Sequence, residues 1–416
     1  MLGPAMDPQT SASPASPASS TAPASGRTGL WVRLAAYYAC GVFAAAQIGK
    51  LATLAPAMQR DLGLALSTMA ILIALIEAGG ALLGVRAGAL AQRLGLVRTL
   101  LGAMALLAAA SAGEALAGGA AALLGWRLVE AAGYVGVIVS APVLMANDGG
   151  AQRAPTLLTV WSTFVPVGLA VGAWAHGAIA DVYHWRAAIG ASAAVALLLG
   201  LATAATQRHA GTHAAAGTAQ APAGDHDRAA LPPEAWILAA AFGAFAVLGI
   251  GAIALLPTVL VEGGLTLGEA GVWSAWAAFA MAPGSLAAGL FVHRPSWHRG
   301  LCTASLLAGG LLTYVMFGTG ATPMVVGLAA VAMNAVLGVF SGLAFALLPG
   351  VAGGPQRTAR AYGALAQFGA SGSLAGPPLM AAAAEHGGWR ATAVLGFALA
   401  VVSLGLALRA LPRKAQ

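Results

Sequence analysis

Charged side chains stand inside long apolar segments of this chain. Lys50 lies between YYACGVFAAAQI and LATLAPAM, while Arg127 and Glu130 belong to the segment RLVEAAGYVGVIV. Glu77 and Arg86 fall in a third segment of the same kind. Charges at membrane depth almost always face a protein interior or a water-filled path. These residue types predict two kinds of chemistry, binding of an anion by the cations and carriage of a proton by the carboxylates.

The positions of the charges along their segments predict two layers. With a helix rise of about 1.5 Å per residue, Lys50 and Arg127 each lie about 10 Å from the outer ends of their helices. Glu77 and Glu130 lie about 15 Å from theirs. We expect Arg127 to hold an anionic group of a substrate in its planar fork, with Lys50 adding a point charge. We expect Glu130, or else Glu77, to couple transport to a proton as a desolvated carboxylate.

Simpler interpretations of the same charges stay open. Arg127 and Glu130 are spaced i, i+3, so they could pair with each other on one helix. Lys50 could pair with Glu77 of the next helix and only hold the bundle together. Arg86 lies near the inner end of its segment, where a long side chain can extend to the interface.

Uncharged polar neighbours complete the predicted binding surface. Phe43, Gln47 and Lys50 recur at i, i+4 and i+7, so they share one face of a helix. Tyr134 shares a face with Arg127 on another helix. The second half of the chain contributes polar residues without charge. The predicted substrate-binding residues are Gln47, Lys50, Arg127, Tyr134, Asn334 and Gln367.

The segments that position these side chains have the length and composition of membrane helices. The chain has 416 residues, of which 59% are hydrophobic and 8% charged, whereas about a quarter of a soluble domain is charged. A bilayer core of about 30 Å takes about 20 apolar residues as a helix, and many runs reach that length. The strand-length alternation of a membrane β-barrel is not found. The composition therefore predicts an all-α membrane protein.

Hydropathy predicts twelve spans. They are 31–57, 67–91, 98–117, 120–145, 156–179, 187–205, 235–260, 267–292, 300–319, 323–348, 361–383 and 390–410. One long polar break follows the sixth span and divides the set into six and six. The expected divisions are a disordered cytoplasmic tail at 1–29, a first bundle at 30–206, a cytoplasmic linker at 207–233 and a second bundle at 234–416.

Basic residues predict the orientation. Arg60, Arg186 and Arg390 are the basic residues of the outer loops, whereas the other connections carry many more. Cytoplasmic loops are enriched in Lys and Arg, so we expect both termini in the cytoplasm and the chain in the bacterial inner membrane. This distribution explains the formal net charge of +7 without a nucleic-acid partner.

The two cysteines, Cys40 and Cys302, form no metal motif, and we expect no metal and no cofactor.

Two motifs recur in the two halves. GALAQRLGLVRTL begins at Gly88 and GLFVHRPSWHRGL begins at Gly289. Each has an Arg five residues after the Gly and another five further on, namely Arg93 and Arg98, then Arg294 and Arg299. HWRAAIG and GWRATAVLG recur in the same way before the last span of each half. Parallel repeats of six helices are a transporter architecture, and we expect the arginines to hold helix ends by capping carbonyls or meeting acids.

These motifs resemble those of the major facilitator superfamily. GALAQRLGLVR is similar to its G-x-L-A-D-R-x-G-R loop motif, with Gln92 in place of the acid. RLVEAAG is similar to its fourth-helix motif. GLAVGAWAHG is similar to its fifth-helix antiporter motif, with Ala173 in place of Pro and His176 in place of Gly. The GK in the first span, followed by PAMQRDLGL, further resembles the cyanate/nitroimidazole-type branch.

The resemblance, which covers about residues 30–410, implies two bundles that rock around a central cavity. Helices one and four line that cavity in the superfamily, so Lys50 and Arg127 would reach one ligand. We predict a monomeric secondary transporter of a small anionic organic or inorganic solute, with protons as a candidate coupling ion. The alternative is a proton-coupled exporter of drugs, siderophores or other amphipathic metabolites, which the fifth-helix motif favours. A membrane enzyme or sensor is the third class, but the sequence has no catalytic motif, so we expect no enzyme.

Overall fold

The computed structural model describes residues 24–150, 152–161, 163–208, 230–291, 293–353 and 355–411. Most of the expected tail (1–29) and linker (207–233) lies outside these ranges. Within them every regular element is a helix.

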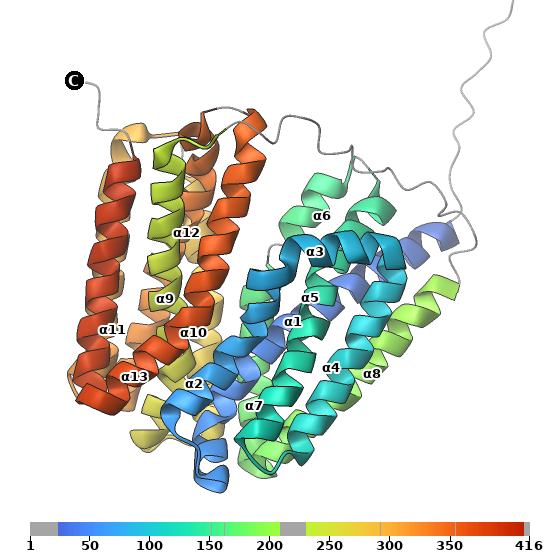
Figure 1. The fold of residues 1–416 in the computed structure, drawn as a ribbon, viewed down its shortest axis with the longest axis horizontal. Helices are drawn as coiled ribbons and strands as arrows, with labels where there is room; N and C mark the ends of the chain where they lie inside the picture. The colour runs from blue at the N-terminus through green and yellow to red at the C-terminus, as the bar shows by residue number, and fades with distance from the viewer. Residues whose placement is uncertain are drawn as a thin grey trace, which may run out of the picture.

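Two groups of helices lie side by side (Figure 1). The first half contains α1 (Ala24–Leu62), α2 (Leu66–Ala74), the 3-10 turn η1 (Leu75–Glu77), α3 (Ala78–Leu94), α4 (Leu96–Leu116), α5 (Ala120–Gly149), α6 (Ala154–Trp161), α7 (Phe164–Val182) and α8 (Trp185–Arg208). The second half contains α9 (Pro233–Glu262), α10 (Leu267–Gly289), α11 (Pro295–Gly318), α12 (Pro323–Ala352) and α13 (Pro355–Ala410).

The described helices supply the twelve predicted spans. Nine of them are long and apolar enough to cross a membrane, and one of these nine, α13, holds two spans. Gly388 divides α13 with a φ of 70°, a conformation that glycine adopts without the steric cost of a side chain. The segment formed by α2, η1 and α3 gives one more span, and α10 gives the twelfth.

Two spans are interrupted where the sequence predicts continuous helices. The span predicted at 156–179 is built from α6 and α7. Pro166 lies in the first turn of α7. Its ring disfavours a helical conformation in the preceding turn, and it has no N–H to donate to a helical hydrogen bond. A helix therefore begins near this proline rather than continuing through it. The second span tightens into η1 at Leu75–Glu77. A short 3-10 stretch inside a helix often marks a hinge or a strained position, and here it carries the charged residue Glu77.

The HWR and GWR motifs make the same contact in each half. The indole of Trp185, at the start of α8, donates to Oδ2 of Asp61 at 3.0 Å. The indole of Trp389 donates to Oε2 of Glu262 at 2.8 Å. Asp61 and Glu262 lie at the ends of the first helix of each half. The repeat seen in the sequence is therefore a repeated link between the first and last helix of each half.

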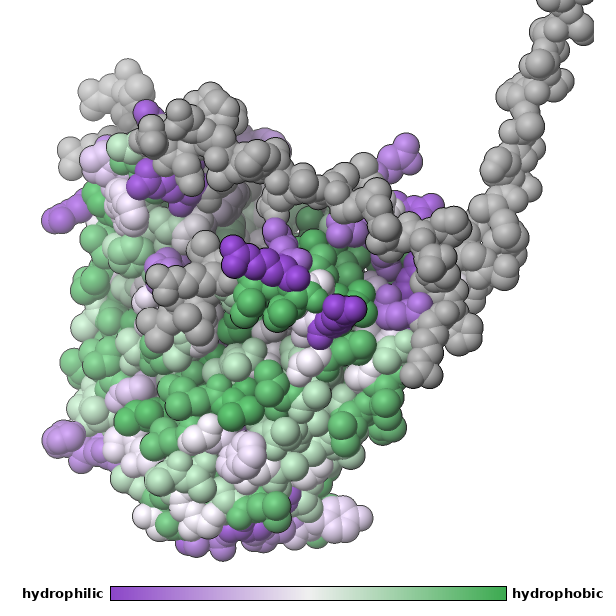
Figure 2. Space-filling model, turned by 45° about the vertical axis from the view of Figure 1, so that its right-hand side comes forward, coloured by the Kyte–Doolittle hydropathy of each residue, from purple (hydrophilic) through white to green (hydrophobic). Residues whose placement is uncertain are grey.

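Hydrophobic side chains cover the middle of the molecular face in Figure 2, while hydrophilic side chains gather toward its two ends. This distribution matches a bilayer, whose apolar core excludes charges and whose interfaces accept them.

Close contacts between the halves occur at the end of the molecule far from the start of α1 (Figure 1). The backbone N–H of Ser67 in α2 donates to Oε1 of Glu385 in α13 at 2.8 Å. Helices α7 and α10 cross at two glycines: a Cβ on Gly177 would lie 2.6 Å from the Leu267 carbonyl oxygen, and a Cβ on Gly271 would lie 3.2 Å from the Gly177 Cα. The bare backbones therefore allow the halves to close at this end.

We predict that Gly177→Val opens this end of the molecule. In a background with Cys40→Ala and Cys302→Ala, cysteines at Ser67 and Glu385 should be joined by a short bifunctional reagent, because the native residues touch. Adding Gly177→Val should lower the crosslinking yield several-fold, since the new side chain meets the backbone of α10.

The matched control is Gly190→Val on α8, where a Cβ meets no atom within 4 Å. An unchanged yield with Gly177→Val, or an equal loss with Gly190→Val, would show that the glycine crossing does not set the closure.

Candidate functional site

Four charged side chains form a cluster inside the first half. Lys50 of α1, Glu114 of α4, and Arg127 and Glu130 of α5 are all 0% exposed. Lys50 Nζ lies 2.6 Å from Oε2 of Glu114 and 2.6 Å from Oε1 of Glu130. Arg127 forms an ion pair with the other oxygen of Glu130. Lys50 therefore bridges two carboxylates, and Arg127 extends the chain of charges.

The Arg127 guanidinium also fixes neighbouring backbone. It donates to the carbonyl oxygens of Leu72 at 2.9 Å, Gln47 at 3.1 Å and Ile73 at 3.3 Å. Leu72 and Ile73 lie in the last turn of α2, directly before η1. A planar group with five donors can satisfy several acceptors at once, so Arg127 joins α5 to α1 and to the interrupted second span.

Close packing of α1 on α7 encloses the cluster. A Cβ on Gly49, next to Lys50, would lie 3.3 Å from the Leu169 carbonyl oxygen, and a Cβ on Gly172 would lie 2.5 Å from the Ala46 carbonyl oxygen. Small residues let helix backbones approach in a membrane. The glycines of the antiporter-like motif thus bring α7 against the Lys50 region of α1.

Glu77 lies at the edge of this cluster. It is half-buried in η1, close enough to Arg127 and Tyr134 for electrostatic interaction with both. Two cations, Lys50 and Arg127, therefore face three carboxylates. With all five groups ionised the cluster would carry one excess negative charge, and burial of an uncompensated charge is costly.

The contacts of Glu114 indicate where a proton would reside. Neither of its carboxyl oxygens accepts a well-directed hydrogen bond from a donor among the described residues. Glu114 and Glu130 both lie 2.6 Å from the Lys50 ammonium, so two buried carboxylates share one cation. One proton on either carboxyl group would remove the excess negative charge of the cluster. The pair is therefore where a proton would be stabilised.

The structure brings three of the predicted substrate-binding residues together. Gln47, Lys50 and Arg127 meet in the cluster, where Gln47 is buried and its amide donates to the Phe43 carbonyl oxygen at 3.2 Å. Tyr134 is buried near Glu77. The other two belong to the second half: Asn334 of α12 is buried and donates to the Ala330 carbonyl oxygen at 3.1 Å, and Gln367 of α13 is exposed.

Two sequence-based interpretations are corrected. Lys50 pairs with Glu114 and Glu130 rather than with Glu77, because α4 and α5 turn their carboxylates toward α1. Lys50 and Arg127 are also not a pair of uncompensated cations, since each has a carboxylate partner. Pairing of Arg127 with Glu130 at i, i+3 was left open by the sequence and is formed.

Glu114 was missing from the predicted site. The sequence signal was present, because this residue lies inside the span predicted at 98–117, three residues before its end. It was not named among the charges inside the spans, whereas α4 buries it fully. A charge near the end of an apolar run can therefore still belong to the interior.

The repeated loop arginines differ between the halves. Arg299 donates to the carbonyl oxygens of Leu408 at 2.6 Å and Leu411 at 2.9 Å, at the end of α13. The guanidinium of Arg294 lies 6.0 Å from the centre of the Trp297 ring. In the first half, where Gly88 lies within α3, Arg93 and Arg98 are exposed.

Comparison with known protein families shows which family the chain belongs to. The family model of the Major Facilitator Superfamily matches residues 37–376. The chain belongs to the Major Facilitator Superfamily. It is therefore a secondary transporter and not an enzyme, which removes the membrane enzyme or sensor as a class. A search of curated proteins finds no match.

Solved structures of other transporters have the same fold. A bacterial homologue of the human lysosomal transporter Spinster, in an inward-facing and occupied conformation, has a TM-score of 0.74 at 16% identity, covering 91% of this chain and 94% of that one. The unoccupied inward-facing form has a TM-score of 0.73 at 16% identity, covering 92% and 95%. The nucleoside transporter NupG has a TM-score of 0.68 at 12% identity, covering 91% and 98%.

We predict that Lys50→Met destabilises this transporter by about 3–5 kcal/mol, the usual effect of removing one partner from a buried ion pair. The change leaves Glu114 and Glu130 without the cation between them. Thermal unfolding in detergent, followed by tryptophan fluorescence, measures the loss.

Adding Glu114→Gln to Lys50→Met should restore part of the stability, because it removes one of the unpaired charges. Glu77→Gln is the matched control and should restore less, since Glu77 is not a partner of Lys50. Equal recovery with both would contradict the pairing seen here.

Proposed function

We propose that the protein is a proton-coupled secondary transporter whose Glu114–Glu130 pair carries the coupling proton. The observation that carries the proposal is that two fully buried carboxylates, Glu114 and Glu130, share the single ammonium of Lys50. Glu130 and Glu77 were the coupling residues expected from the sequence, and Glu114 joins them.

Charge balance supports a role for one proton. Burial of an uncompensated charge is unfavourable, and one proton on the cluster would neutralise its excess negative charge. Loss of that proton would leave the cluster charged and favour a wetter arrangement. The titratable and charged groups near the pair are Lys50 from α1, Arg127 from α5 and His176 from α7, and Glu77 of η1 lies beside Arg127.

The contacts of Arg127 connect this charge to the surface between the halves. Arg127 binds Glu130 on one side and the carbonyl oxygens of Leu72 and Ile73 on the other. The same helix, α2, begins at the Ser67 contact with Glu385. A proton on the carboxyl pair weakens the hold of Glu130 on Arg127 and can shift α2 relative to α13. A ligand shifts an equilibrium through such differential contacts.

We place the protein in the bacterial inner membrane as a functional monomer, with both termini in the cytoplasm. On this topology the closed end, marked by Ser67 and Glu385, faces outward. The inward-facing state of the Spinster homologue structures supports the same assignment.

Amphipathic metabolites are the substrate class that we favour, moved outward in exchange for protons. The supporting observation is that Lys50 and Arg127 are both paired and fully buried, so neither of these two cations is free to bind an anionic substrate in this conformation. The antiporter-like motif on α7 agrees with export.

Symport of a small anionic solute is the second candidate. Protonation of Glu114 and Glu130 would leave Lys50 and Arg127 with unbalanced positive charge, which an anion could neutralise. The resemblance of GK and PAMQRDLGL to the cyanate/nitroimidazole-type branch favours the same class.

We predict that the proton on the carboxyl pair controls closure. Spin labels at Leu116→Cys and Met324→Cys, exposed positions on the two halves, should report a distance distribution that changes between pH 6 and pH 8. Glu114→Gln or Glu130→Gln should remove most of this change, because neither amide can titrate.

Glu234→Gln, an exposed carboxylate at the start of α9, serves as the control and should keep the full response. If both cluster variants respond to pH like the unmodified protein, the coupling site lies elsewhere or the coupling ion is not a proton.

The substrate class is tested in everted vesicles with an established pH gradient. We expect an amphipathic amine such as ethidium to dissipate the gradient in vesicles with the protein, while Glu114→Gln vesicles lose this effect. Acridine orange fluorescence measures the gradient. Dissipation by benzoate but not by ethidium would replace export with the anion symport function.

A further inference from the structure

An apolar groove lies on the first half, among α3, α4 and α5. Its volume is about 970 Å³, within the range of sites that enclose a small ligand. Its lining includes Leu90, Arg93, Arg98, Gly102, Leu106 and Leu128. All of the residues that line it belong to the first half.

The groove combines apolar walls with positive charge. Leu90, Leu106 and Leu128 are 55%, 41% and 56% exposed, respectively. At one end stand Arg93, in the last turn of α3, and Arg98, in the first turn of α4, both exposed. Among the described residues neither arginine pairs with a carboxylate. The start of α4 also lacks a side-chain cap, which adds partial positive charge.

The position of the groove fits the bilayer. Figure 1 shows α3 bending across the front of α5 near the end of the molecule where α1 begins. Leu90 and Arg93 lie on this part of α3, with the arginine closer to its end. Aliphatic side chains at membrane depth followed by arginines at the interface match a lipid, which has alkyl chains below a charged headgroup.

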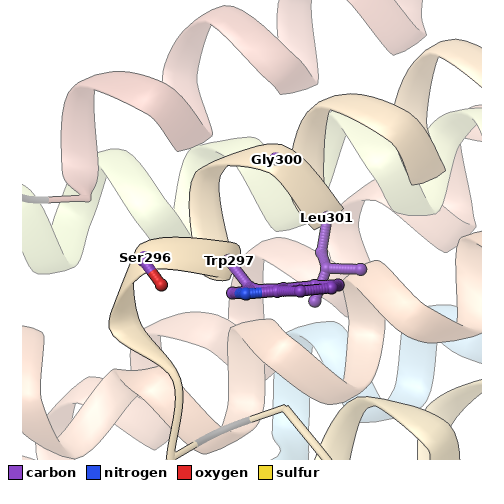
Figure 3. Close-up of a pocket in the computed structure, with 4 residues that line it drawn as sticks. All are labelled: Ser296, Trp297, Gly300 and Leu301. Atoms are coloured by element: carbon purple, nitrogen blue, oxygen red, sulfur yellow. The ribbon is translucent and has the colours of Figure 1, made fainter.

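The second half repeats the arginine spacing beside a pocket with a different lining. Its counterpart loop has a surface pocket lined by Ser296, Trp297, Gly300 and Leu301, all from the first turns of α11 (Figure 3). The Trp297 ring stacks on Phe291 at 5.6 Å. Arg299 is already engaged by the end of α13. The first-half arginines thus differ from their repeats by facing an open apolar channel.

We propose that this groove binds an anionic phospholipid of the cytoplasmic leaflet. The phosphate lies between Arg93 and Arg98, which can form charge-assisted hydrogen bonds to its oxygens. An acyl chain follows the groove past Leu106 and Leu128. Basic pockets between membrane helices on the cytoplasmic side recognise anionic headgroups. The site rests on the proposed topology and is independent of the ionic cluster.

The test compares lipids retained by the purified transporter. Protein in mixed micelles is offered equal amounts of phosphatidylglycerol and phosphatidylethanolamine, and native mass spectrometry counts the lipids that remain bound. We expect phosphatidylglycerol to be retained preferentially, and Arg93→Ala with Arg98→Ala to lower its retention several-fold. Arg294→Ala is the matched control from the second half and should change nothing.

A second variant tests the groove itself. Gly102 lines the groove, and a Cβ there meets no atom within 4 Å, so Gly102→Trp should fill the space while both arginines remain. It should also lower phosphatidylglycerol retention several-fold, with an unchanged melting temperature showing that the fold persists.

Two results would overturn the proposal. Unchanged lipid retention in either the double arginine variant or Gly102→Trp would show that phosphatidylglycerol does not occupy this groove. Loss of transport in Gly102→Trp with unchanged lipid retention would assign the groove to the transported solute instead.

Discussion

The ammonium group of Lys50, held between two carboxylates, is the interaction on which the first half depends. An isolated charge at this depth would be too costly, so the cation requires α4 to present Glu114 and α5 to present Glu130. The glycine contacts between α1 and α7 close the space around it. Arg127 then joins the same charges to the end of α2. The Lys50 ammonium thus joins three helices, α1, α4 and α5.

The sequence predicts the fold well because the membrane restricts it. Span length and internal hydrogen bonding follow from the bilayer, so twelve spans could be placed from hydropathy. Charged residues of the site, such as Lys50 and Glu130, could also be identified from the sequence, because charges are rare inside membrane spans. Their partners could not be assigned, because pairing depends on the rotation of each helix about its axis. Glu77 and Glu114 both lie on neighbouring helices, and only packing shows that Glu114 reaches Lys50.

The two halves use their shared motifs differently. Trp185 and Trp389 keep the same carboxylate contact in both, as expected of a link that holds a bundle together. The loop arginines have diverged, since Arg299 binds the end of α13 while Arg98 stays exposed. The buried ionic cluster also belongs to the first half. One half therefore provides the charged interior, whereas the buried polar side chains described in the other half are uncharged.

The contact between Ser67 and Glu385 has an unusual tolerance to substitution. Its donor is a backbone N–H at the start of α2, which every residue except proline supplies. Sequence drift at position 67 therefore leaves the bond intact, and only the acceptor at position 385 can tune its strength. A transporter built this way can adjust the strength of this contact between its halves through a single side chain, without changing either helix.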